Sequence, residues 1–427
     1  MRTSFWFLPS IMTLAAIILS LLLIRLDVWL DTDAIEDSLW IYKFGPEGAR
    51  AILSAIAGSM ITVAGLTFSI TMLSLQLASS QFGPRLLRNF MRDRGNQLVL
   101  GTFIATFLYC LLVLRAVRGT EESHFVPHLA AAFGVVLALA SLAVLIYFIH
   151  HMAVSIRIET LLAELAAETR ATIDHLYPER LGEGTASGDA QQVDNPFGAG
   201  RAPPVRPVCA RLGGYVQRVD IDALLNLAST HDLVARIDAR PGRFVTAQDP
   251  LLSLVPIERV TDEIAERFEA AVVIGGERTP EQDLEFSLRR IVEIAQRALS
   301  PGINDPTTAL YCIDRLCAAL AQLAARRRPS PLRFDADGRL RVVTETLSLD
   351  EAACPAFAAI ARYALADRDV VARLITGIDG LIGLAPDSAR AALTAQRSAI
   401  LDAGARQASI VSDAAALRAF AREHADT

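Results

Sequence analysis

Four long runs without a charged residue dominate the first third of the chain. They cover residues 3–24, 51–84, 95–114 and 123–156. A membrane-spanning helix needs roughly 20 mainly apolar residues, because hydrocarbon offers its backbone no water as a hydrogen-bond partner. The pattern therefore predicts an α-helical polytopic membrane domain in residues 1–177, with four spans at about 5–26, 50–80, 96–117 and 125–154. Runs of this length exclude a soluble protein.

The pattern changes after the fourth run. Residues 155–177 keep a helical period with charged positions between the apolar ones, which predicts a helical extension of the last span. Residues 178–206 are rich in Gly, Pro and Ala and show no period, which is typical of a flexible linker.

The remainder of the chain divides by period into two parts. Residues 207–257 alternate in period two around Gly213-Gly214 and Pro241-Gly242, which predicts a small β-rich unit, a barrel or a sandwich, with a brief helix capped by Asp220 or Asp222. Residues 258–427 favour a mainly helical part. The expected fold is thus a four-span membrane domain followed by a cytoplasmic α+β domain with a β-rich unit and a helical unit.

Helix starts can be placed within the helical part. Thr279 to Gln282 has the form of a capping box with Pro280 in the first turn, and Asp305 is expected to cap the next helix with Pro306 at its first position. The stretch that begins at Phe334 reads FDADGRL and predicts a hairpin turn.

Charge gives the expected orientation in the membrane. The connection between the second and third runs is basic, whereas the connection after the first run is acidic. Short basic loops stay in the cytoplasm, so both termini are expected there. The basic residues are Arg85, Arg88, Arg92 and Arg94. They contact lipid phosphates or form a basic mouth of a pathway, and the sequence leaves both readings open.

The second run is unusually long and polar. As a helix, its 34 residues would extend about 50 Å, well beyond the roughly 30 Å of hydrocarbon. Thr62, Ser69, Gln76 and Ser80 share one arc of the helical wheel with Gly58 and Gly65, and Thr67, Thr71 and Ser74 form a second stripe opposite. The first stripe is a candidate pathway lining. Hydroxyls that bond to their own helix and small residues that allow close helix packing are the alternatives.

Two long stretches carry a resemblance to a known family. One begins at Phe68 and reads FSITMLSLQLASSQFGPRLLRNF, and the other begins at Ile274 and reads IGGERTPEQDLEFSLRRIVEIAQRALSPGINDPTTA. With the Phe-Ile-His-His stretch at Phe148, they resemble the signature stretches of domain of unknown function 2254, a family of predicted bacterial inner-membrane proteins. The resemblance implies a multi-pass protein of that membrane and brings no catalytic residue with it.

Composition excludes several other classes. The net charge of −6 lacks the concentrated basic surface that nucleic acid requires. The five cysteines form no CxxC pair, and no phosphate-binding loop, zinc spacing or nucleophile elbow is present, so no enzyme, cofactor or metal is expected. Glu285, Glu293 and Asp305 are carboxylates close in sequence, but no catalytic order supports them.

Two functional hypotheses follow. The first is an oligomeric ion channel or passive transport protein whose partners are the bilayer, further copies of the chain and a small anion or inorganic ion, with a regulatory cytoplasmic domain. The second is a membrane-anchored sensor or scaffold that binds a ligand or partner through that domain. Its candidate ligand turn is Asn304, Asp305, Thr307 and Thr308, because a helix N-terminus offers N–H groups to an anion. A structural helical hairpin explains the same residues.

Overall fold

The computed structural model describes residues 6–29, 45–82, 93–120, 123–155, 157–177, 195–198 and 203–407, with 412–413, 415–417 and 419. The chain forms two compact units, residues 1–160 (unit 1) and 161–427 (unit 2). Each is described by itself.

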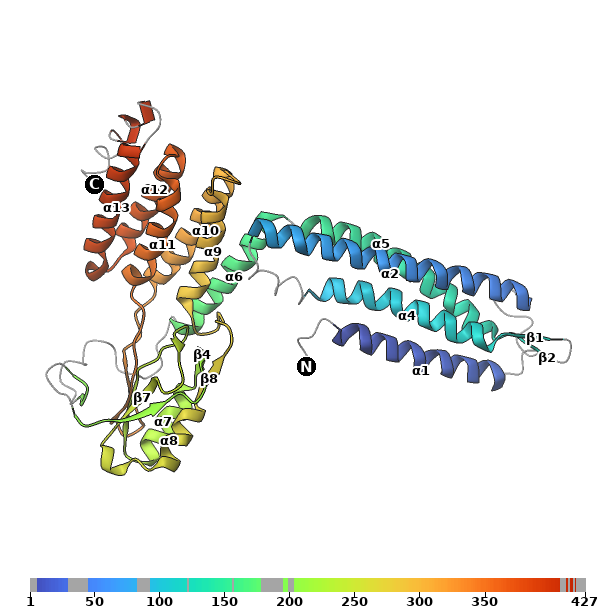
Figure 1. Ribbon diagram of the computed structural model, residues 1–427, viewed down its shortest axis with the longest axis horizontal. Coiled ribbons are helices and arrows are strands. Elements are labelled where there is room, and N and C mark those ends of the chain that lie inside the picture. Colours follow the sequence, from blue (N-terminus) through green and yellow to red (C-terminus); the bar gives the residue numbers. More distant parts are fainter. Residues whose placement is uncertain are drawn as a thin grey trace. The chain divides into compact units, whose positions relative to one another are not determined.

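Unit 1 is built from four long helices that lie side by side (Figure 1). They are α1 (Phe7–Trp29), α2 (Pro46–Phe82), α4 (Arg94–Ala116) and α5 (His128–Ser155), with a two-stranded antiparallel ribbon of β1 (Arg118–Thr120) and β2 (Ser123–Phe125). Helix α4 packs against α1, α2 and α5 and so forms the centre of this unit.

Five helices in the described part of the chain are long and apolar enough to cross a membrane. Four of them are the helices of unit 1, at the positions that the uncharged runs predict. The fifth is α10 (Pro306–Ala325) of unit 2, which packs against α9 (Leu284–Ala298) and α12 (Arg368–Leu384). Length and composition thus give five candidate spans where the charge pattern predicts four.

Small and polar side chains join the helices of unit 1. A Cβ at Gly134 would lie 3.1 Å from Cδ2 of Leu53, so this glycine lets α5 approach α2 closely. The buried hydroxyls of Thr106 and Ser141 lie 3.1 Å apart across α4 and α5. Gly134 and Ser141 both belong to α5, so small side chains of this helix allow its close contacts with α2 and α4.

One carboxylate caps a helix from a different helix. Asp27, near the end of α1, accepts hydrogen bonds from the N–H groups of Leu129 and Ala130, both at 2.9 Å, at the start of α5. The hydroxyl of Tyr109 in α4 donates to the carbonyl oxygen of Ala130 at 2.8 Å. Free N–H groups at a helix start need such acceptors, and here three helices meet at one cap.

The predicted extension of the last span is a separate helix, α6 (Ile158–Leu176), which begins two residues after α5 ends. Its apolar face is buried in unit 2, and its polar groups are fixed there. The hydroxyl of Thr172 donates to the carbonyl oxygen of Pro280 at 3.1 Å, and Glu168 forms an ion pair with Arg290. Asp174 accepts hydrogen bonds from Gln322 and Arg326.

Unit 2 contains two small sheets (Figure 1). The first has the order β3 (Arg206–Cys209), β7 (Pro250–Val255), β5 (Val234–Ile237), β10 (Leu340–Val343) and β9 (Leu332–Phe334), and the second has the order β6 (Phe244–Val245), β4 (Gly214–Val219) and β8 (Val272–Gly275). All strand pairs are antiparallel except β5 with β10. Helices α7 (Ile221–Thr230) and α8 (Asp262–Ala270) contribute to the same core, and a short 3-10 turn, η4 (Ile257–Arg259), precedes α8.

The sheets draw strands from beyond residue 257. Strands β8, β9 and β10 lie in the part predicted to be mainly helical, and β10 pairs with β5 in parallel, with Val342 opposite Ala235. Alternation along the chain cannot reveal a pairing between strands about a hundred residues apart. The local predictions are confirmed: Asp220 caps α7, and the hairpin that contains Phe334 connects β9 and β10.

The helical part consists of α9, α10, α11 (Leu349–Ala364), α12 and α13 (Asp387–Gln407). The prediction that Asp305 caps α10 is confirmed, but the predicted capping box at Thr279 is wrong, because α9 begins only at Leu284 with Asp283 as its cap. The reason is that the preceding segment is held by β4. The side-chain amide of Gln282 bonds both the N–H and the carbonyl oxygen of Val219.

An ion-pair cluster fastens the β9–β10 hairpin to the turn before β5. Arg341 is buried, and its guanidinium donates to Asp335 at 2.6 Å and to Asp232 at 2.8 Å, while Arg259 donates to Asp232 as well. These guanidinium contacts lower the pKa of Asp232. Burial works to raise the pKa of Asp335, but the hydrogen bonds from Arg341 and from the N–H of Arg339 outweigh it and hold this pKa below its ordinary value.

The cluster predicts an acid-dependent loss of stability. A carboxylate whose pKa is lowered by folding stabilises the fold above its unfolded pKa of about 3.9, and that contribution is lost as the pH falls through the folded value. Arg341→Gln should therefore lower the melting temperature at pH 7. The difference in melting temperature between the variant and the wild type should become smaller toward pH 3. Thermal unfolding of the full chain in detergent, followed by circular dichroism, measures both.

Arg218→Gln is the matched control for this experiment, because Arg218 lies exposed on β4 and makes no ion pair with a described residue. It should leave the melting temperature unchanged. If the difference in melting temperature between Arg341→Gln and the wild type stays constant from pH 7 to pH 3, the carboxylates paired with Arg341 are not the source of the acid-dependent loss.

Candidate functional site

The predicted pathway residues lie on the outer face of α2. The side chains of Thr62, Ser69 and Gln76 are exposed on the surface of the single chain. Those of the opposite stripe, Thr67, Thr71 and Ser74, are buried. Ser80 also belongs to α2, and its side chain lies outside the described residues. The two stripes therefore have different surroundings: one faces the interior of unit 1, and the other faces away from it.

Hydroxyls on both stripes bond to their own helix. Thr62 donates to the carbonyl oxygen of Gly58 at 2.8 Å, Ser69 to that of Gly65 at 2.9 Å, and Thr71 to that of Thr67 at 2.8 Å. This is the bonding that the structural alternative expects. The amide of Gln76 is different, because it makes no hydrogen bond with any residue that the structure describes.

The glycines of the outer stripe are open. A Cβ built on Gly58 or on Gly65 would meet no atom within 4 Å. These glycines therefore do not serve packing inside the chain itself, in contrast to Gly134, and the outer face of α2 has space for close approach of another helix.

Of the predicted basic residues, Arg94 lies in the described part of the chain, as the first residue of α4, where it is exposed. Arg85, Arg88 and Arg92 lie outside the described residues.

The start of α4 carries an ionisable pair that the uncharged runs do not reveal. Asp93 caps the helix by accepting a hydrogen bond from the N–H of Gly95 at 2.8 Å, and its second carboxylate oxygen lies 2.6 Å from Nε2 of His151 in α5. The ring of His151 stacks on that of Tyr147 with centroids 5.3 Å apart. A Cβ at Gly95 would lie 2.8 Å from Nε2 of His151, so a larger residue here would force the side chains of this pair to shift.

Asn96 is the second feature that sequence analysis missed. It lies inside an uncharged run, where a single amide is easily read as part of an ordinary span. In the structure it is 3% exposed, and neither its amide nitrogen nor its oxygen makes a hydrogen bond with a described residue. A buried amide without a partner lowers the stability of the fold. Unit 1 thus contains an unpaired polar group in its interior, in addition to the polar outer face of α2.

The candidate ligand turn is capped by the chain itself. The N–H and the hydroxyl of Thr308 donate to the carboxylate of Asp305 at 3.0 Å and 2.6 Å, and the N–H of Asp305 donates to the carbonyl oxygen of Ala298 at 2.8 Å. Asn304 has φ 49°, a left-handed conformation that asparagine tolerates well. Thr307 is exposed. Since Asp305 already takes up the N–H of Thr308, this geometry is that of the helical hairpin.

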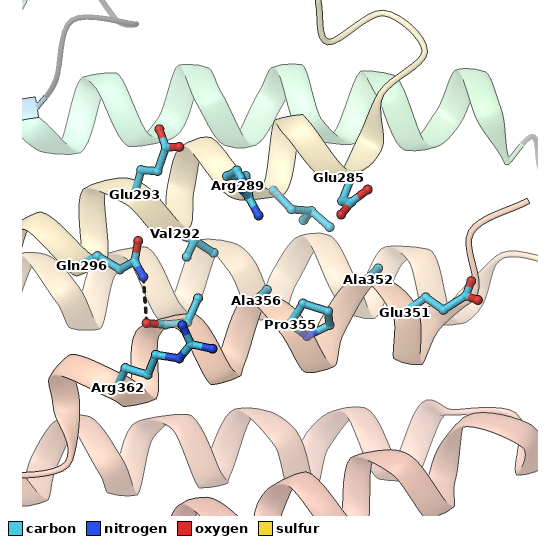
Figure 2. Close-up of a pocket in the computed structure, with 12 residues that line it drawn as sticks. Glu285, Arg289, Val292, Glu293, Gln296, Glu351, Ala352, Pro355, Ala356 and Arg362 are labelled. Atoms are coloured by element: carbon cyan, nitrogen blue, oxygen red, sulfur yellow. Dashed lines mark hydrogen bonds between the residues drawn. The ribbon is translucent and has the colours of Figure 1, made fainter. Parts of the chain in front are cut away.

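A groove between α9 and α11 is a concave site in unit 2 (Figure 2). Its volume is about 270 Å³, and its floor is apolar, formed by Leu288, Val292, Ala352, Pro355, Ala356 and Ala359. Five charged side chains and one amide surround this floor: Glu285, Arg289, Glu293, Gln296, Glu351 and Arg362. The amide of Gln296 donates to the carbonyl oxygen of Ala359 at 2.9 Å and fixes the two helices to each other at one end.

Comparison with known proteins places the chain among membrane proteins. The profile of the family described as "Predicted membrane protein (DUF2254)" matches residues 2–379. The uncharacterized proteins Rv1290c of Mycobacterium tuberculosis and Mb1321c of Mycobacterium bovis are each 39% identical to this chain over 308 residues. The matched segment covers 70% of this chain and 57% of each relative's length. No solved structure matches the chain.

The pair at the start of α4 gives a graded prediction for stability. Asp93→Ala removes both the helix cap and the partner of His151, and should destabilise the chain by about 1–2 kcal/mol. Asp93→Asn keeps an acceptor for the N–H of Gly95 and should cost clearly less. Melting temperatures in detergent rank the variants, with Asp402→Ala, at an exposed position of α13, as the control. Equal effects of Asp93→Ala and the control would contradict the proposed cap.

Proposed function

The chain belongs to the family of predicted membrane proteins DUF2254, and we propose that it is a multi-pass protein of the bacterial inner membrane that forms an oligomeric channel or passive transport protein. In this proposal the outer face of α2 lines the pathway, and unit 2 is the cytoplasmic regulatory domain. The permeant species is a small inorganic ion.

The observation that carries the proposal is the exposed polar face of α2. In a bilayer, an amide such as that of Gln76 without a partner costs several kcal/mol unless it meets water or another protein group. Thr62 and Ser69 continue this face toward the middle of the helix, and Gly58 and Gly65 leave room beside it. A face of this kind is better suited to water or to a second copy of the chain than to lipid.

The proposed orientation follows from charge. With α1, α2, α4 and α5 as the four spans, the arginine-rich connection between α2 and α4 lies in the cytoplasm together with both termini. Arg85, Arg88, Arg92 and Arg94 then belong to the cytoplasmic side, where they favour anions or hold lipid phosphates. The fifth candidate, α10, stays with unit 2, because its neighbours α9 and α12 belong to that unit.

The alternative function is a membrane-anchored sensor or scaffold. The groove between α9 and α11 favours it, since this groove combines an apolar floor with a charged rim. The channel hypothesis gives unit 2 a regulatory role, whereas the sensor or scaffold binds its ligand or partner there, and the two differ in whether unit 1 conducts.

Assembly through the outer face of α2 is tested by Gly65→Leu. The structure leaves open space at this position, so the substitution should not disturb the single chain, but it should block close approach of a second copy. We expect a smaller molecular mass for the variant in detergent by light scattering. Gly380→Leu is the control, because Gly380 of α12 is equally open and lies in unit 2. An unchanged mass for Gly65→Leu would show that this face is not the interface.

Conduction is tested by ion flux into liposomes that contain the purified protein, with K⁺, Na⁺, H⁺ and Cl⁻ measured in turn. Gln76→Leu and Ser69→Leu should abolish flux, because each replaces a polar group of the pathway by an apolar one. Thr62→Val should reduce it for the same reason.

The matched control is Thr102→Val in α4. The hydroxyl of Thr102 bonds to the carbonyl oxygen of Leu98 at 2.8 Å, just as that of Thr62 bonds to Gly58, but Thr102 lies on another helix. This variant should conduct like the wild type. Absence of flux in the wild type, or equal flux in Gln76→Leu, would overturn the channel proposal and favour the sensor.

A further inference from the structure

We propose that the groove between α9 and α11 binds a small organic anion, one that carries a phosphate or carboxylate group on a compact apolar body. This inference goes beyond the proposed function, because binding is measured directly and does not depend on whether unit 1 conducts.

The carboxylates around the groove are already engaged. Glu285 forms an ion pair with Arg240 at 3.0 Å. Glu351 accepts a hydrogen bond from the N–H of Ser348 at 2.8 Å, and Arg328 lies 4.0 Å from the same carboxylate.

Glu293 has an interaction partner too, and Figure 2 shows its carboxylate pointing away from α11. None of the three acidic groups is therefore left to balance a charge inside the groove.

The two guanidinium groups of the groove are not engaged. Arg289 on α9 and Arg362 on α11 form neither a hydrogen bond nor an ion pair with any residue that the structure describes. The groove is lined by three carboxylates and two guanidinium groups, and Arg240 and Arg328, which lie outside this lining, neutralise Glu285 and Glu351. The lining charges without a partner are thus the two guanidinium groups, which present planar donors suited to phosphate or carboxylate oxygens.

The apolar floor sets the second requirement. The small side chains of Ala352, Ala356 and Ala359 form the floor on the α11 side, and Leu288 and Val292 form it on the α9 side. Pro355 lies inside α11 and lacks an N–H group. The carbonyl oxygen of Glu351, one helical turn earlier, therefore does not receive its usual backbone hydrogen bond. An inorganic anion alone would leave this floor unused, whereas an anion with an apolar body covers it and places its charge between Arg289 and Arg362.

The groove matches the size of such a ligand. Its volume of about 270 Å³ is just below the range of roughly 300–1,000 Å³ for small-molecule sites, which favours a single compact ring or a short chain over a nucleotide. The walls are fixed by the bond between Gln296 and Ala359 and by the capping box of Ser348 and Glu351 at the start of α11. A site with fixed walls loses little free energy to ordering when a ligand binds.

Isothermal titration calorimetry on the full chain in detergent tests the proposal with three probes. Phenyl phosphate carries both features, inorganic phosphate carries the charge alone, and benzyl alcohol carries the ring alone. We expect phenyl phosphate to bind with a Kd of about 1 mM or below, and each of the other two at least about tenfold more weakly.

Variants place the binding in the groove. Arg289→Gln and Arg362→Gln should each weaken phenyl phosphate binding by about tenfold or more, because each loses a charged hydrogen-bond donor. Arg315→Gln is the matched control, since Arg315 is an exposed arginine of α10 outside the groove and without an ion pair to a described residue. It should bind like the wild type. Melting temperatures of all three variants verify that they are folded.

Three outcomes would overturn the inference. If phenyl phosphate does not bind the wild type, the groove is not a site for this class of ligand. If phenyl phosphate binds Arg289→Gln and Arg362→Gln as tightly as it binds the wild type, the proposed place of binding is wrong. If it binds the wild type no more tightly than inorganic phosphate does, the proposed role of the apolar floor is wrong. None of these outcomes bears on flux, which is measured separately.

Discussion

Helix α6 is tied to the core of unit 2 along its buried face, and only two residues separate it from α5. Its apolar face is buried, Glu168 and Asp174 are paired with arginines, and the hydroxyl of Tyr177 donates to the carbonyl oxygen of Leu347 at 2.8 Å. Burial raises the pKa of Tyr177 to about 12, in keeping with its enclosed position. Unit 2 therefore holds the continuation of the last helix of unit 1 as part of its own fold.

Unit 1 obeys a different constraint, namely that polar groups away from water need partners. Asp27 and Asp93 meet it by capping helix starts, and the hydroxyls along α2 meet it by bonding to the turn before them. Asn96 and Gln76 remain without such partners among the described residues, one inside the unit and one on its outer face. The buried Nδ1 of His128 is a third such group. Polar residues without partners in apolar helices are where function is expected.

Sequence analysis located what depends on local pattern. The helices of unit 1, the caps of α7 and α10, and the β9–β10 hairpin are encoded within a few turns of chain. It failed where distant segments meet. The parallel pairing of β5 with β10, the true start of α9 at Asp283 and the contact between Asp93 and His151 each depend on a partner far away in sequence. The α9–α11 groove likewise needs two helices whose separation only tertiary packing fixes.

Helix α9 connects the features of unit 2 that bear on function. Arg289 faces the groove, and the next residue, Arg290, is buried and forms the ion pair with Glu168 of α6. Since neighbouring residues of one helix cannot move independently, a displacement of α9 that alters the groove also alters the hold on α6. A ligand in the groove would change the hold on α6 only by as much free energy as it favoured one position of α9 over another, and by linkage the reverse would hold. Arg289 and Arg290, neighbours in α9, thus connect the groove with the helix that follows α5.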